Sequence, residues 1–231
     1  MQSPLSNRSE IADRLVAAFD GYSSAWTALR TQTCEATRVH HVQSTALLDR
    51  KIECLDGHLL DVRALAQIFI AGRNYSANDQ QFVALLNRSI EASQKLPPLA
   101  QCETATTDKT PAALSTVDRE RIANIRALAT AGLFEPAKTQ SAAALATPHD
   151  AMVRAELQFV HAEASEQLGQ FADVATEYQA AAREAARVGA DELRSRIWLA
   201  YAYFIGHTQA KPSEGLQLLT VADEAILRAQ D

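Results

Sequence analysis

Cysteines and histidines are the side chains of this 231-residue chain whose types suit covalent or metal chemistry. Cys54 and His58 are four residues apart, a spacing that places both on one face of a helix. A thiolate and an imidazole are ligands that zinc prefers. Cys34, His40 and His41 could approach this pair only if the chain bends sharply between them, and the chain has no CxxC zinc-knuckle spacing. The sequence therefore predicts no metal ligands and no cofactor.

The three cysteines allow either three buried thiols or one disulfide with one cysteine left over. If a hairpin turn is centred near His41, Cys34 and Cys54 are offset by about six residues, or roughly 9 Å along antiparallel helices. That offset exceeds the usual Cα separation of a disulfide. A third helix that returns along the second one would bring Cys102 towards the level of Cys54. A disulfide, if one forms, is therefore expected between Cys54 and Cys102, and buried thiols stay the alternative.

The sequence carries none of the motifs that mark common catalytic sites. It has no G-x-S-x-G or H-E-x-x-H motif, and its eight glycines are scattered, so no glycine-rich phosphate loop is present. The H-R-D and D-F-G motifs of protein kinases are also missing. We therefore expect a chain that is not an enzyme.

Charge and hydropathy argue against nucleic acids and membranes as partners of this chain. The net charge is −6, and residues 1–100 carry ten basic and ten acidic side chains, whereas residues 101–231 carry twelve and eighteen. An acidic half is a poor surface for phosphate groups, so we expect no nucleic-acid partner. No apolar run reaches the roughly 18–20 residues of a membrane-spanning helix, and we expect no membrane contact by this chain itself.

Apolar residues recur every three or four positions along most of the first hundred residues, which is typical of α-helices. Helices are expected over about residues 9–37, 44–72 and 78–95, and Ser44 is a suitable N-cap for the second. Two prolines follow the third helix and end it. The sequence predicts an N-terminal three-helix unit over residues 1–102.

A pattern of glycine, phenylalanine and a small residue recurs further along the chain. The shared positions are Gly132, Phe134 and Ala137 in one copy, and Gly169, Phe171 and Val174 in the next. The copies are 37 residues apart, and a degenerate third copy follows 41 residues later, with Gly215 in the small position and Pro212 in place of the phenylalanine. This period, with small residues where two helices meet, is typical of tetratricopeptide repeats.

These patterns together predict an all-α fold. We expect the N-terminal three-helix unit, a polar threonine-rich linker over residues 103–117, and about three tetratricopeptide-like helix pairs over residues 118–231. A plain helical bundle is the alternative to a helical-repeat solenoid.

In stacked helix pairs the first helix of each pair lines an inner groove. A groove of mixed charge with apolar centres suits an extended peptide or a partner helix. Counting from the Gly-x-Phe turns, the predicted partner-binding residues are Arg119, Ile122, Arg126, Glu156, Phe159, Glu163, Arg194, Ile197 and Tyr201.

Several short motifs precede the repeats in a distinctive order. They are Trp26, Cys34 to Val39, Gln43 and Ser44, Leu47 to Asp49, Cys54 to Asp56, and Leu96 to Cys102. With the repeats that follow, this order resembles the C-terminal regulatory region of myxobacterial-type serine/threonine protein kinases, over about residues 22–225. The chain departs from that pattern at His40 and His41, where arginine or a small residue is usual, and in the missing turn aromatic of the third repeat.

The resemblance implies a function that composition and spacing do not show. In such kinases a kinase domain and a single membrane helix precede this region. This chain would then be the non-catalytic interaction or sensor region of a membrane-anchored kinase, on the extracytoplasmic side of a bacterial membrane. It would bind a protein or peptide partner or associate with itself. A free-standing scaffold, which would be cytoplasmic, and a sensor that binds a small ligand stay open as alternatives.

Overall fold

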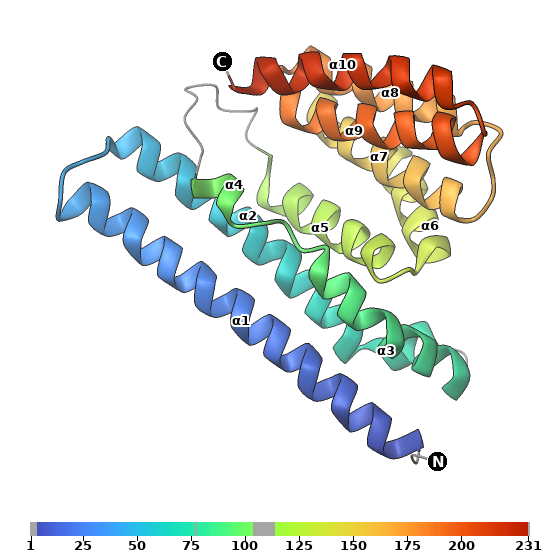
Figure 1. The fold of residues 1–231 in the computed structure, drawn as a ribbon, viewed down its shortest axis with the longest axis horizontal. Coiled ribbons are helices and arrows are strands. Elements are labelled where there is room, and N and C mark those ends of the chain that lie inside the picture. Colours follow the sequence, from blue (N-terminus) through green and yellow to red (C-terminus); the bar gives the residue numbers. More distant parts are fainter. Residues whose placement is uncertain (1–3, 77, 104–113, 231) are drawn as a thin grey trace. The chain divides into compact units, whose positions relative to one another are not determined.

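The computed structural model describes residues 4–76, 78–103 and 114–230, and these residues fold entirely as helices and their connections (Figure 1). The predicted all-α fold class is therefore confirmed for the described part of the chain. The chain forms two compact units, Met1–Thr106 with Thr130–Gly132, and Thr107–Ala129 with Leu133–Asp231. Most of the predicted linker falls outside the described residues, and a helix already begins at Thr116, inside the range expected to be linker.

The first unit is built on three long helices. Its elements are α1 (Pro4–Arg38), α2 (Thr45–Ile70), the 3₁₀-helix η1 (Gly72–Tyr75), α3 (Asp79–Gln94) and the short α4 (Ala100–Glu103). Helices α1 and α2 run antiparallel, and α3 packs against both (Figure 1). The side chains of Ser44 and Asn78 cap α2 and α3 by accepting backbone N–H bonds, so these helices begin where the sequence predicts.

Polar contacts attach α1 to the rest of this unit. The Tyr22 hydroxyl donates to the carbonyl of Pro97 at 2.8 Å, and the Trp26 indole donates to the carbonyl of Leu55 at 2.7 Å. At the corner between α1 and α2, the Gln43 amide donates to the Thr33 carbonyl at 2.7 Å. The stretch from Trp26 to Ser44 is thus a helix end and a hairpin corner.

The second unit winds the chain back and forth through successive helices. They are α5 (Thr116–Thr130), α6 (Phe134–Leu145), α7 (Ala151–Gln167), α8 (Val174–Arg187), α9 (Asp191–Tyr203), the π-helical turn η2 (Phe204–Thr208) and α10 (Pro212–Gln230). From α6 to α10 each helix packs on the next one in the chain (Figure 1).

Glycine turns end two of these helices at the positions expected from the repeat. Gly132 and Gly169 have φ angles of 75° and 73°, which side chains with a Cβ rarely adopt. After Gly169, the backbone N–H of Gln170 donates to the Ser165 carbonyl at 2.9 Å, the closing bond of a Schellman turn. The glycine is required here because a left-handed residue must end α7.

Small residues behind the turns are buried as the repeat predicts. Ala137 and Val174 have no exposed surface. Phe171, expected to fill the gap at the turn, instead lies with 41% of its surface exposed and its ring 5.9 Å from that of Phe204. It covers the edge of the core because the turn lies at the surface. The turn glycine and the buried small residue thus recur, and the tetratricopeptide solenoid stays a prediction.

Candidate functional site

A row of carboxylates lies along α7 in the second unit. Glu156 and Glu163 are seven residues apart, two helical turns, and so lie on the same face of the helix. Glu156 is 6% exposed, and its Oε1 atom is 3.6 Å from Arg126 Nη1 on α5. Its Oε2 atom is buried and has no hydrogen-bond partner among the residues that the structure describes. A buried carboxylate oxygen without a donor is unusual in a folded protein.

Glu163 lies in the middle of this row and has an altered acidity. Burial raises the pKa of its carboxyl from 4.5 to about 7. Arg196 on α9 opposes this shift, whereas the neighbouring carboxylates of Glu156 and Glu166 add to it. Burial outweighs the opposing effect of the arginine, so near neutral pH the carboxyl is divided between its protonated and ionised forms.

Glu166, at the end of the row, is held by two hydroxyl groups. Tyr178 on α8 donates to its Oε2 atom at 2.9 Å, and Thr208 in η2 donates to its Oε1 atom at 2.8 Å. Burial, reinforced by the nearby charges of Glu163 and Glu166, raises the pKa of the Tyr178 hydroxyl, which therefore stays protonated and remains a donor. Glu166 thus joins three elements, and its role is structural.

A second cluster lies in the first unit. Cys54 and Cys102, the pair expected from the sequence, form a disulfide with a Cα–Cα distance of 5.6 Å, and Cys34 is a free, partly exposed thiol. His58, one turn after Cys54 on α2, places its Nδ1 atom 3.5 Å from the Cys102 sulfur. The sequence places Cys54 and His58 on one face of a helix. It does not show that Cys102 lies beside them and completes a cluster of three potential metal ligands.

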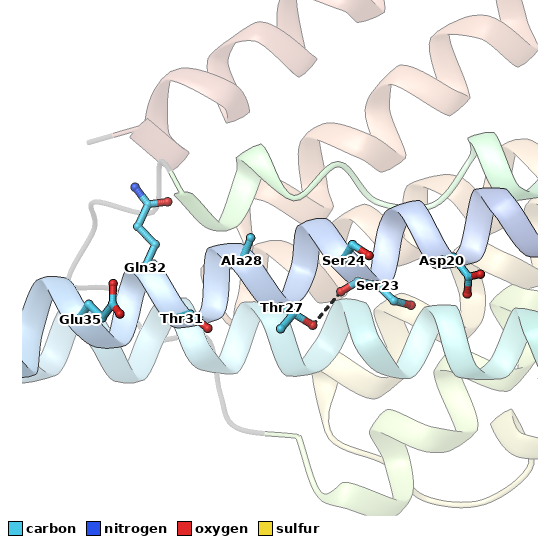
Figure 2. Close-up of a pocket in the computed structure, with 8 residues that line it drawn as sticks. All are labelled: Asp20, Ser23, Ser24, Thr27, Ala28, Thr31, Gln32 and Glu35. Atoms are coloured by element: carbon cyan, nitrogen blue, oxygen red, sulfur yellow. Dashed lines mark hydrogen bonds between the residues drawn. The ribbon is translucent and has the colours of Figure 1, made fainter.

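A shallow polar strip runs along one exposed face of α1 (Figure 2). The residues that line it all belong to this helix: Asp20, Ser23, Ser24, Thr27, Ala28, Thr31, Gln32 and Glu35. Its only interaction drawn in Figure 2 is local, from the Thr27 hydroxyl to the Ser23 carbonyl at 2.8 Å. The strip is a small-residue helix surface and brings no acid and base together for catalysis.

No protein-family model matches this chain, and no curated protein and no solved structure is significantly similar to it. None of the helices in the described ranges is long and apolar enough to cross a membrane.

Four of the predicted partner-binding residues lie inside the second unit. Ile122, Phe159, Ile197 and Tyr201 are 3%, 4%, 0% and 7% exposed and belong to its hydrophobic core. We expected these residues to face a partner, but their burial leaves almost no surface for one, and this prediction is corrected. Helices that have neighbours on two sides bury a wide apolar stripe. The apolar positions of the first helices are therefore used for packing within the unit.

The charged members of the predicted set divide into two groups. Arg126, Glu156 and Glu163 come together in the carboxylate row. Arg119 donates to the carbonyl of Leu114 at 3.0 Å, and Arg194 pairs with Asp191 in its own helix at 3.8 Å. These last two contacts are local and stabilise helix starts.

Sequence reasoning missed Arg196, which influences Glu163 and lies over the ring of Phe159 with its Cζ atom 5.7 Å from the ring centroid. The prediction selected Arg194, two residues earlier on the same helix. The phase of the third repeat was uncertain because its turn phenylalanine is replaced by Pro212.

The Glu163→Gln variant is expected to change how stability depends on pH. Because folding raises the pKa of this carboxyl, its contribution to stability is fully present below about pH 4.5 and is lost as the pH rises through about 7. The glutamine variant cannot ionise. The difference between its free energy of unfolding and that of wild type should therefore grow in its favour by about 2 kcal/mol as the pH rises from 5 to 8. Urea unfolding at both pH values measures this difference.

The exposed Glu120, on α5, provides the matched control. Its replacement by glutamine should leave the pH profile parallel to that of wild type. If the profile of Glu163→Gln were also parallel to wild type, the raised pKa of Glu163 would be wrong.

Proposed function

We propose that this chain is a non-catalytic interaction module whose second unit binds a protein segment with a basic side chain. The observation that carries the proposal is Glu163, a partly exposed residue whose carboxyl is buried near two other carboxylates, with a pKa of about 7. A lysine or arginine from a partner would supply the missing positive charge. Ionisation of Glu163 would then be favoured, and the attraction between the carboxylate and the partner's positive charge would contribute to binding.

The buried Oε2 atom of Glu156 supports the same proposal. Arg126 Nη1 lies 3.6 Å from the Oε1 atom, and the Oε2 atom has no hydrogen-bond partner among the described residues, so a partner's donor could pair with it once the side chains that bury it move aside. Desolvated acceptors of this kind gain more from a charged donor than exposed carboxylates do. The row therefore favours basic segments over acidic ones.

On the resemblance described above, we also propose that the chain is the sensor region of a membrane-anchored serine/threonine kinase. Partner binding, or self-association, would change the proximity of the attached kinase domains. Sequencing the DNA upstream of the Met1 codon tests this part. An open frame with kinase motifs and an apolar segment would support it, and a stop codon directly upstream would favour the free-standing scaffold.

Peptide binding tests the interaction itself. The probe is a set of fluorescent twelve-residue peptides with lysine or arginine at the centre, each paired with a peptide that carries glutamate there. Fluorescence anisotropy should show binding of the basic set, weaker at pH 5 than at pH 8 because Glu163 is protonated at low pH. Glu163→Gln should weaken binding about tenfold, a change of about 1.4 kcal/mol.

The exposed-site variant Glu120→Gln should bind the basic peptides as wild type does. The proposal fails if basic and acidic peptides bind equally, or if Glu163→Gln leaves affinity and pH dependence unchanged.

A further inference from the structure

Cys54, His58 and Cys102 in the first unit form a compact cluster of two sulfurs and an imidazole, closed by a disulfide. We propose that this cluster is a redox-controlled zinc site: the oxidised disulfide form binds no metal, and the reduced form binds one Zn²⁺ through both thiolates and His58. The inference concerns the first unit and is independent of the partner binding proposed for the second.

The distances fit one tetrahedral ion. With zinc–sulfur and zinc–nitrogen bonds of about 2.3 and 2.0–2.1 Å, a sulfur and a nitrogen on the same ion lie about 3.6 Å apart. His58 Nε2 is 3.9 Å from the Cys102 sulfur and 4.0 Å from the Cys54 sulfur. The Nε2 atom is thus nearly equidistant from both sulfurs, and the Nδ1 atom is 3.5 Å from the Cys102 sulfur. Once the disulfide is opened, rotation of the cysteine side chains can bring the sulfurs to the roughly 3.8 Å that two zinc-bound thiolates require.

Packing contacts, in addition to the disulfide, position the three ligands. Cys54 and His58 are one turn apart on α2, a helix anchored by Leu55, which has no exposed surface. Cys102 is 1% exposed on α4, which packs against α2. Positions fixed by a packed helix lower the entropy lost when a metal binds.

The ligand chemistry selects the metal. Two thiolates and an imidazole are soft to borderline donors that favour zinc over magnesium or calcium, which require oxygen ligands. The fourth tetrahedral position would be taken by water. This arrangement holds a metal more weakly than a closed four-ligand structural site, as a reversible switch requires.

The redox step is a two-electron reduction. A dithiol reductant donates two electrons and two protons to the Cys54–Cys102 disulfide, the sulfur–sulfur bond breaks, and the reductant closes into its own disulfide. Zn²⁺ then displaces the two thiol protons, which are released to solvent. In the reverse direction, a disulfide oxidant accepts two electrons from the two thiolates and two protons from solvent to become a dithiol, the Cys54–Cys102 bond forms again, and the ion is released.

Zinc titration of the full chain tests the proposal. The protein is reduced with a phosphine, desalted without oxygen, and titrated with Zn²⁺ against a coloured chelating indicator. We expect one Zn²⁺ per reduced chain and none per oxidised chain. Titration with Co²⁺ should give the thiolate charge-transfer band and the strong visible bands of tetrahedral coordination.

Two variants identify the ligands. His58→Gln should weaken zinc binding at least tenfold, with an unchanged helical circular dichroism spectrum as the check on folding. Cys34→Ser, which removes the free thiol, should bind zinc as wild type does. The proposal is overturned if the reduced wild type binds no zinc, if His58→Gln binds it equally well, or if Cys34→Ser abolishes binding.

Discussion

The Tyr178→Ala variant is expected to destabilise the second unit by about 4 kcal/mol. Tyr178 is 1% exposed, and its ring centroid lies 5.9–6.2 Å from those of three other aromatic residues, Phe159, Tyr201 and Phe204. Alanine would leave a cavity the size of the ring and remove the hydroxyl that donates to Glu166. Urea unfolding followed by circular dichroism measures the loss.

Tyr178→Phe separates the two contributions. It keeps the ring contacts and removes only the hydroxyl, so Glu166 would retain Thr208 as a donor and lose Tyr178. We expect a loss of about 1–2 kcal/mol. An equal loss in both variants would mean that the hydrogen bond, and not ring packing, dominates at this position. A loss below about 1 kcal/mol for alanine would contradict the placement of Tyr178 in the core.

The Gly215→Ala variant is expected to destabilise the same unit by about 2 kcal/mol. This substitution usually stabilises a helix, because alanine has the higher helix propensity. Here α10 crosses the end of α9 so closely that a Cβ atom on residue 215 would lie 2.7 Å from the Gly206 Cα atom and 2.8 Å from the Ala202 carbonyl oxygen. Both neighbours are backbone atoms, so the helices must move apart.

Gly57→Ala is the control that distinguishes this contact from propensity. Gly57 lies inside α2, and a Cβ atom there would meet nothing within 4 Å. The same substitution should therefore stabilise the first unit by about 0.5–1 kcal/mol. Thermal unfolding of both variants should shift in opposite directions, and a shift in the same direction would contradict the close approach of α10.

Helix caps and turn glycines, which are short-range features of the sequence, predicted much of the fold. Ser44 and Asn78 accept backbone N–H bonds at helix starts, and a glycine is needed where Gly169 adopts a positive φ. These features are properties of a few neighbouring residues. They are readable from sequence because capping and turn geometry depend on nearest neighbours.

The candidate sites depended on contacts between distant residues. Phe159 and Ile197 follow the helical period, but the period does not show whether a partner or another helix of the same unit covers them. In the structure both are core residues. Arg196 approaches Glu163 from a different helix, and its position follows from the rotation of α9 in its packed state. A phase error of two residues on that helix was enough to select Arg194 instead.

By itself, the sequence determined the helical class, the main helix boundaries of the first unit and the turn glycines, and it favoured Cys102 over Cys34 as the partner of Cys54 if a disulfide forms. Only the tertiary structure decided that His58 lies beside that disulfide, that three glutamates of α7 share one partly buried environment, and that Gly215 meets backbone. The physical reason is that helix signals act over a few residues. Ligand clusters, altered pKa values and close helix crossings are set by side chains that are far apart in the chain and meet only after packing.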